Sequence, residues 1–378
     1  MKKFICDIDV TGSCNLRCPS CPQGNIKGYR LPRGFMEPEL LARIIRKVTS
    51  ECFVERCSLF SWCEPLLHPR LPELIRIVRE AGVPSYLSSN LNILTNVDAI
   101  MAENPTFFRI SLSGFSQEVY GYTHRGGNIK RVKQHMLELA EAKKRHNSST
   151  RIYVYYHRYL HNLKEEPLMR RFSTDLGFEF EPVWALFFPV EKIFSYLGED
   201  ENSFSLTAED HELIENLAVP LGKALEAAKG NRNMPCLLRD KAISLNFEGN
   251  FTLCCGVFDA SKYTLGNYLE TPLDEIQRMR ESHPMCNRCM AHGIHRYLIH
   301  GFQELTELAL AHIAPEDAEL LNLRHEIAQI HKRQKLIRIY DTLFTRILSP
   351  EKKASLADRF YHLDRFLSRL HQKNKGKG

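Results

Sequence analysis

The chain has 378 residues, of which 43% are hydrophobic and 25% charged, and its formal net charge is +6. This length and apolar fraction suit a globular protein that buries its core without disulfide bonds. Charges of both signs are spread along the sequence, which argues against nucleic-acid and membrane partners and leaves an anionic small substrate compatible. Because no apolar run approaches the roughly 20 residues of a membrane span and no signal-peptide core follows Met1, we expect a cytoplasmic protein.

Strand and helix patterns alternate regularly in the first half of the chain. The predicted strands are residues 4–10, 54–61, 83–88, 107–113, 151–157 and 178–184. The predicted helices between them are residues 37–48, 71–80, 95–104, 128–146 and 165–175. This alternation predicts an α/β fold in which a parallel sheet curves into a partial (β/α)6 TIM barrel, with ligands at the carboxyl ends of the strands.

The second half is expected to be organised differently. After a barrel over residues 1–189, we expect a helical linker over 190–234, a small domain of strands and turns over 235–292, and a helical extension with a disordered tail over 293–378. Within the small domain, Ile243 to Cys255 reads as a β-hairpin that turns at Glu248-Gly249-Asn250.

The twelve cysteines fall into two groups, with seven at or before Cys63 and five between Cys236 and Cys289. Disulfides are rare in a reducing compartment, where closely spaced cysteines more often bind metals. The distribution therefore suggests two metal sites.

The first group is Cys14, Cys18 and Cys21, which follow the first predicted strand with the spacing C-x3-C-x2-C. Three thiolates on one loop can bind three irons of a [4Fe–4S] cluster and leave the fourth iron open to a small ligand. The alternatives are buried structural cysteines or a zinc site, although structural zinc takes a fourth ligand that the loop does not supply. The loop resembles the signature of the radical S-adenosylmethionine (SAM) superfamily. That resemblance implies a cluster that binds SAM and cleaves it to a 5′-deoxyadenosyl radical, which takes a hydrogen atom from the substrate.

Three later segments resemble the rest of the SAM site in that superfamily, in the same order. Ser61 to Pro69 resembles the Gly-Gly-Glu-Pro segment and its continuation, Tyr86 to Asn90 a strand end near the SAM ribose, and Arg109 to Gly114 the segment Ile-Ser-Leu-Asp-Gly. The resemblance implies that SAM is bound by Glu64 through its amino group, by Asn90 near its ribose, and by Ser111 and Arg125 through its carboxylate.

Trp62 and Cys63 stand where the superfamily has its two glycines. Glycine lets a ligand approach the backbone closely, so this part of the site should differ from that of relatives.

The second cysteine group resembles the auxiliary-cluster domain of radical SAM enzymes, in its short "twitch" form rather than the longer SPASM form. The resemblance implies a second [4Fe–4S] cluster bound by Cys236, Cys254, Cys286 and Cys289, with Cys255 spare. These spacings also permit a zinc site. Cys254 and Cys255 could exchange roles, because adjacent residues of a strand point to opposite faces.

The expected function is that of an enzyme which abstracts hydrogen from a small hydroxylated metabolite, such as a sugar, an aminocyclitol or a glycan precursor. Dehydrogenation and epimerisation are the outcomes we favour, with a reductase such as flavodoxin or ferredoxin as electron donor. Epimerisation requires a hydrogen-atom donor, for which Cys63 and Cys255 are candidates unless they are inert buried thiols. The candidate substrate contacts come from the later strands: Tyr155, Tyr156, His157, His161, Glu181 and Trp184.

Two other functions stay open. One is a peptide- or protein-modifying radical SAM enzyme, although such enzymes often carry an N-terminal leader-binding domain and only thirteen residues precede Cys14, which makes this function less expected. The other is a noncatalytic metal-binding interaction protein that holds a partner with its helical extension. Glu64 and the order of the SAM-site segments argue against the latter.

Overall fold

The computed structural model describes residues 1–26, 33–199, 205–300 and 304–332. Met1–Leu321 form one compact unit, and the remaining described residues belong to a second. The apolar helical pattern predicted from Leu336 onward and the disordered tail lie outside the described residues.

Six parallel strands form the barrel sheet, which confirms the predicted α/β class. They stand in sequence order in the sheet, so each crossover connects neighbouring strands. The strands are β1 (Lys3–Ile8), β2 (Phe53–Ser58), β3 (Ser85–Ser89), β4 (Phe107–Leu112), β5 (Arg151–Arg158) and β6 (Glu179–Trp184).

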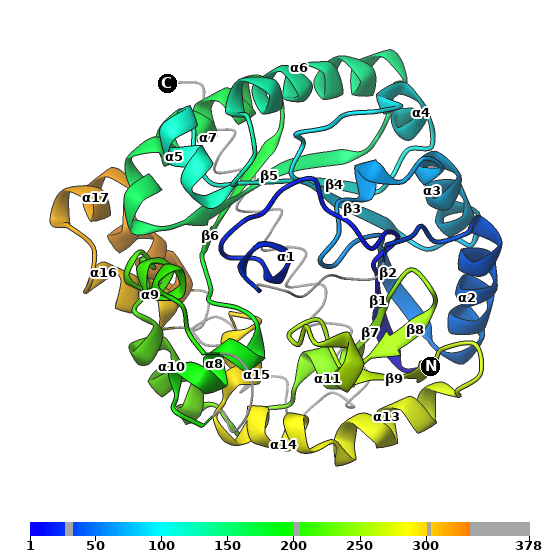
Figure 1. Cartoon of the computed structure of the whole chain (residues 1–378). Helices are drawn as coiled ribbons and strands as arrows, with labels where there is room; N and C mark the ends of the chain where they lie inside the picture. The colour runs from blue at the N-terminus through cyan, green and yellow to red at the C-terminus, as the bar shows by residue number, and fades with distance from the viewer. Residues whose placement is uncertain (27–32, 200–204, 301–303, 333–378) are drawn as a thin grey trace. The chain divides into compact units, whose positions relative to one another are not determined.

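The predicted helices follow these strands and lie outside the curved sheet (Figure 1). They are α2 (Pro38–Glu51), α3 (Leu71–Glu80), α4 (Val97–Ala102), α6 (Ile129–Arg145) and α7 (Glu166–Asp175). Three short elements between them were not predicted, because one or two turns are too short to show helical periodicity: η1 (Pro65–Leu67), α5 (Gln117–Thr123) and η2 (Leu160–Glu165).

Alternate residues of each strand face the helices and the inside of the barrel, as β4 shows. Phe108, Ile110 and Leu112 are completely buried and belong to the hydrophobic core, and burying each such side chain stabilises the fold by about 1.5–3 kcal/mol. Arg109 and Ser111 alternate with them and are only partly buried. The inner face of the sheet is therefore polar and partly open, as a ligand-binding site requires.

Three strands from the second half of the chain extend the same sheet. β7 (Ala242–Leu245) pairs in parallel with β1, and β8 (Asn250–Thr252) and β9 (Thr264–Asn267) continue antiparallel. The predicted hairpin is present, and its turn includes Gly249, whose φ of +78° favours glycine. The hairpin thus adds to the barrel sheet, while the domain boundaries expected at 190, 235 and 293 stay predictions.

The chain after β6 is more helical than predicted. The expected linker contains three helices, α8 (Val190–Tyr196), α9 (Ala208–Glu215) and α10 (Leu221–Gly230). The segment expected as strands and turns also contains α11 (Leu237–Lys241), α12 (Ala260–Tyr263), α13 (Leu273–Ser282) and α14 (Pro284–Ala291). α15 (Ile294–Tyr297), α16 (Leu305–Leu310) and α17 (Pro315–Leu320) follow. Within the described ranges, no helix combines the length and apolar character needed to cross a membrane.

Candidate active site at the carboxyl ends of the strands

A large cavity opens at the carboxyl ends of the barrel strands, with an empty volume of about 1480 Å³ counted to its mouth. Ligands of parallel α/β sheets bind at this edge. Many of the residues singled out in the sequence line this cavity: Cys14, Cys18, Cys21, Cys63, Glu64, Asn90, Ser111, Tyr155, His157 and Trp184. We call it the barrel cavity.

The loop that carries Cys14, Cys18 and Cys21 runs from β1 into α1 (Pro22–Asn25), which Figure 1 shows inside the ring of strands. The loop turns tightly, since the amide of Cys21 donates to the carbonyl of Cys18 at 3.1 Å. Gly24 packs against this turn so closely that a Cβ there would lie 2.3 Å from the Cys18 carbonyl oxygen. The turn therefore requires glycine at position 24.

The three thiols fit a cluster better than they fit free cysteines. Burial raises the pKa of Cys14 to about 11 and that of Cys21 to about 12, and Cys14 also raises the pKa of the other two thiols. Thiolates so crowded and so buried require nearby positive charge, which iron supplies. Across the described residues, no three His, Cys, Asp or Glu side chains converge on a single metal-ion position. A cluster instead takes each thiolate on a separate iron.

Glu64 ties the end of β2 to the end of β3. Its side chain is buried, its Oε1 accepts from the amide of Leu66 at 3.1 Å, and its Oε2 accepts from the amide of Asn90 at 2.8 Å. Burial raises its pKa to about 7, against the effect of these hydrogen bonds. Glu64 thus shapes the cavity wall beside Cys14, and its contact with the SAM amino group stays a prediction.

Asp9 is a site residue that the sequence reasoning missed. Its Oδ1 accepts hydrogen bonds from the amides of Ser61, Trp62 and Cys63 at 2.8, 2.9 and 2.9 Å. Burial raises the pKa of Asp9, while the Cys63 thiol and the three amides lower it. One carboxylate therefore holds the loop in which Trp62 and Cys63 replace the two glycines.

The residues predicted to bind the rest of SAM are separated in the structure. Asn90 lines the barrel cavity, and its Nδ2 donates to Asn15 Oδ1 at 2.8 Å. Ser111 also lines the cavity. Arg125 is not among the lining residues, and its half-exposed side chain forms an ion pair with Glu209. It lies beside the three-cysteine loop, because its carbonyl accepts from the amide of Arg17 at 3.0 Å and its charge lowers the pKa of Cys18, so its contact with the SAM carboxylate stays a prediction.

Three of the six candidate substrate contacts line the cavity, namely Tyr155, His157 and Trp184. The others do not. Tyr156 faces the opposite side of β5, where its hydroxyl donates to the carbonyl of Asn162 at 2.9 Å. His161 is held by Asn216 through its Nδ1 at 2.7 Å, and Glu181 is not among the lining residues.

The second cysteine group surrounds a smaller cavity with an empty volume of about 390 Å³, which we call the four-cysteine cavity. It is lined by Cys236, Cys254, Cys286 and Cys289, together with apolar side chains. Burial raises the pKa of Cys254 to about 11 and that of Cys286 to about 12, and neighbouring thiols add to both shifts. This donor set and its enclosure suit a second cluster.

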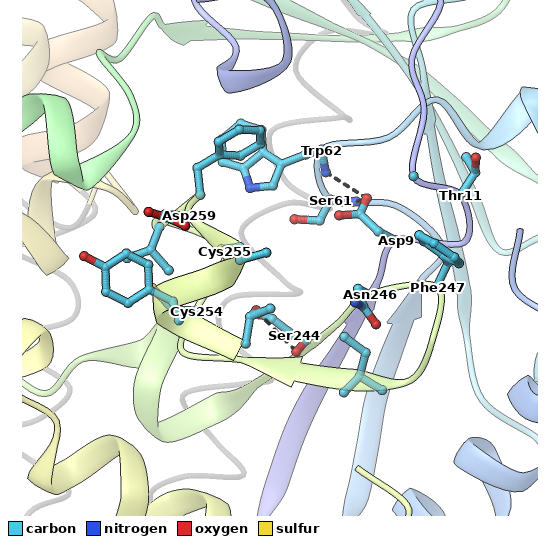
Figure 2. A pocket seen from close by; sticks show the side chains of 17 residues that line it. Asp9, Thr11, Ser61, Trp62, Ser244, Asn246, Phe247, Cys254, Cys255 and Asp259 are labelled. Atoms are coloured by element: carbon cyan, nitrogen blue, oxygen red, sulfur yellow. Dashed lines mark hydrogen bonds between the residues drawn. The ribbon is translucent and has the colours of Figure 1, made fainter. Parts of the chain in front are cut away.

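Cys255 points into a third cavity, whose lining Figure 2 shows. We call it the middle cavity; its empty volume is about 670 Å³. It shares Ser61 and Trp62 with the barrel cavity, and Cys254 and Val257 with the four-cysteine cavity. Cys255 does not line the barrel cavity, so of the two candidate hydrogen-atom donors only Cys63 faces that space.

The model of the radical SAM superfamily matches residues 8–165, which include the first cysteine group and the strands β2 to β5. Residues 8–165 are a radical SAM domain. Such domains use a [4Fe–4S] cluster and SAM, and two curated relatives of this chain are named as enzymes. The domain brings Cys14, Cys18 and Cys21 together with Glu64 and Ser111 around the barrel cavity.

Two curated relatives match part of this chain. The chain is 29% identical over 141 residues to the 7,8-dihydro-6-hydroxymethylpterin dimethyltransferase of Methanocaldococcus jannaschii, and this match covers 36% of the chain and 27% of the relative. It is 27% identical over 110 residues to the S-adenosylmethionine-dependent nucleotide dehydratase of Lacinutrix mariniflava, covering 28% and 22%. The matches thus span about a quarter of each relative.

A solved structure of low sequence identity shares the fold. SuiB of Streptococcus suis bound to S-adenosylmethionine has a TM-score of 0.51 at 13% identity, over 77% of this chain and 68% of SuiB. BtrN in complex with AdoMet and 2-DOIA has a TM-score of 0.44 at 16% identity, over 78% of this chain and 90% of BtrN.

Proposed function

We propose that this radical SAM enzyme abstracts hydrogen from a small hydroxylated metabolite, such as a sugar, an aminocyclitol or a glycan precursor, and so dehydrogenates or epimerises it. The observation that carries the proposal is the lining of the barrel cavity. Three thiols of one loop line it together with hydroxyl and imidazole side chains, and a second set of four thiols surrounds a neighbouring cavity.

Cys14, Cys18 and Cys21 would hold the first cluster, with Asn90 and Ser111 beside the bound SAM. When bound, these groups supply a radical that removes a hydrogen atom from a substrate carbon. The protein's own task is to place that carbon, and the cavity has the volume for both SAM and a small substrate.

Imidazole groups in the cavity suit substrate hydroxyls. His157 donates a ring N–H to the carbonyl of Leu112, and Nε2 of His300 donates to the carbonyl of Trp184 at 2.9 Å. Burial lowers the pKa of His157 to about 3 and also lowers that of His300, so both rings are neutral at pH 7. A neutral ring that donates from one nitrogen accepts at the other, which is the partner that a hydroxyl needs.

Cys236, Cys254, Cys286 and Cys289 would hold the second cluster. Its cavity shares Leu298 with the barrel cavity, so the two sites adjoin. In a dehydrogenation, a carbinol loses one hydrogen atom, one proton and one electron, and the second cluster would accept that electron. In an epimerisation, the Cys63 thiol would instead return a hydrogen atom to the opposite face of the substrate radical, and the thiyl radical left on Cys63 would take one electron from the second cluster and one proton from water to restore the thiol.

The test is anaerobic reconstitution followed by incubation with dithionite, SAM and deuterated candidate metabolites. We expect about eight irons per chain, formation of 5′-deoxyadenosine, and transfer of deuterium into it from a hydroxylated metabolite. The triple variant C14A/C18A/C21A is the control and should form no 5′-deoxyadenosine. Eight irons without SAM cleavage would contradict catalysis, and deuterium transfer only from peptides would indicate a peptide-modifying enzyme.

Cys63→Ala separates the two reactions. A dehydrogenase should keep its product after this substitution, whereas an epimerase should lose turnover while still forming 5′-deoxyadenosine. Cys255→Ala, which changes the middle cavity, is the matched control.

A further inference from the structure

We infer that Arg109 binds an oxyanion of the substrate, a carboxylate or a phosphate, at the floor of the barrel cavity. The inference rests on the proposed function in that it takes the barrel cavity as the substrate site. Arg109 precedes Ser111 by two residues on β4 and shares its inward face, so it lies one layer deeper in the barrel. Among the cavity-lining residues that the structure describes, it is the one arginine or lysine.

The Arg109 guanidinium is held between two aromatic rings. Its central carbon lies 4.8 Å from the ring centroid of Phe60 and 4.7 Å from that of Tyr155, and its Nε donates to Ser88 Oγ at 2.8 Å. Within the described ranges, the bond to Ser88 is the one hydrogen bond of this side chain. Rings on both sides and a fixed Nε set the plane of the guanidinium and leave its two terminal nitrogens for another partner. Terminal nitrogens in a fixed plane are suited to paired hydrogen bonds with a carboxylate or a phosphate.

No carboxylate of the cavity lining neutralises Arg109. Glu64 lines the cavity, but both of its oxygens accept backbone amides. Asp7 and Glu181 lie in the barrel interior but do not line the cavity. Arg56 and Arg109 both lower the pKa of Asp7 against the effect of burial, and Glu181 acts on Tyr86 and Tyr155 together with these two arginines. Two carboxyl groups therefore face two guanidinium groups behind the cavity floor, and Arg109 is the charged group of this set that reaches the cavity, where a substrate anion would meet it.

Polar groups above Arg109 extend the same site. Ser111, His157 and Tyr155 line the cavity from β4 and β5, within the strands that carry Arg109 and its ring partner. A substrate anchored by its anion at Arg109 would then point its hydroxyl-bearing carbons toward the three-cysteine loop. The substrate class that fits is a hydroxylated acid or a sugar phosphate.

The carboxylate of SAM is the other source of an oxyanion in this cavity. Two measurements separate the sources. Binding of inorganic phosphate and of succinate to the reconstituted, SAM-loaded enzyme reports the substrate anion. The dissociation constant of SAM and the rate of substrate-free SAM cleavage report the SAM carboxylate.

The variants are Arg109→Gln and Arg109→Lys, with Arg151→Gln as control on the neighbouring strand, where Arg151 pairs with Glu179 outside the cavity. We expect phosphate and succinate to bind the parent enzyme and to bind R109Q about 10- to 100-fold more weakly, with R109K in between. SAM binding and SAM cleavage should be unchanged, and the visible spectrum of the clusters should show that the variants fold.

Equal anion binding by the parent and R109Q, or no binding by the parent, would overturn the inference. A weakened affinity for SAM in R109Q would assign Arg109 to the SAM carboxylate instead. Neither result depends on turnover. Anion binding at Arg109 can therefore fail while deuterium transfer still supports the proposed function. Deuterium transfer can likewise fail while anion binding at Arg109 is observed.

Discussion

Removal of the Asp9 carboxylate should destabilise the protein more than removal of an ordinary charged side chain. Asp9 Oδ1 accepts from three backbone amides at 2.8–2.9 Å. A hydrogen bond to a charged group contributes about 1.5–3 kcal/mol, but three bonds to one oxygen are not additive, and burial of the charge offsets part of their sum. We therefore expect Asp9→Ala to lower the free energy of unfolding by about 3–5 kcal/mol. Asp9→Asn, which keeps an acceptor oxygen without the charge, should lower it by about 1–2 kcal/mol.

The assay is urea unfolding of the cluster-free protein, followed by circular dichroism, for both variants and for Asp98→Asn. Asp98 is an exposed carboxylate that pairs with Arg145, and because water screens such a pair, its loss should change the free energy of unfolding far less than the loss of Asp9. After reconstitution, the Asp9 variants should also bind SAM more weakly, because the loop that holds Trp62 and Cys63 loses its anchor. If Asp9→Ala were as stable as Asp98→Asn, the three hydrogen bonds would not hold this loop.

Three further changes test other parts of the structure. Cys254→Ala should remove about four irons from the reconstituted enzyme while Cys255→Ala removes none, measured by iron and sulfide analysis, and the opposite pattern would exchange their roles. Burial lowers the pKa of His157 to about 3 in the folded protein, whereas a histidine of the unfolded chain has a pKa of about 6.5. As the pH falls, the unfolded chain therefore takes up this proton first, which favours unfolding. The free energy of unfolding should fall by about 1 kcal/mol between pH 8 and pH 5, after allowance for water in the cavity. His157→Gln should flatten that decline, and an unchanged pH profile would contradict the shift. Glu166 accepts a hydrogen bond from Arg158 Nε at 2.7 Å, and both side chains are only 2% exposed. Because Glu166→Ala leaves the buried Arg158 charge without this partner, it should lower the free energy of unfolding by about 3 kcal/mol. A loss under about 1 kcal/mol in urea unfolding would refute this.

The barrel strands could be predicted because their residues alternate between two clearly different environments. In β4 the residues that face the helices are large and apolar, and those that face the cavity include Arg109 and Ser111. The cysteine groups were equally visible, since their spacing within one loop or one helix turn limits how far apart the thiols can lie. Cys286 and Cys289, for instance, are three residues apart on α14 and therefore on one face.

Contacts between segments far apart in the sequence could not be predicted in this way. Nothing near Arg125 in the sequence indicates that Glu209, on α9, pairs with its side chain. Asp9 gave only a weak signal, its place directly after β1 and before the cysteine loop. Its three amide partners lie more than fifty residues away.

The side chain of Trp62 has a consequence for how the interior is divided. Trp62 lies on the boundary between the barrel cavity and the middle cavity, and Cys254 lies on the boundary between the middle and the four-cysteine cavity (Figure 2). Trp62 Nε1 is buried and has no hydrogen-bond partner among the described residues, as is the case for Thr11 Oγ1 and Ser244 Oγ of the middle cavity. A glycine at position 62 would leave the space of the indole ring open to both cavities. The tryptophan at this position thus sets the shape of two adjoining cavities.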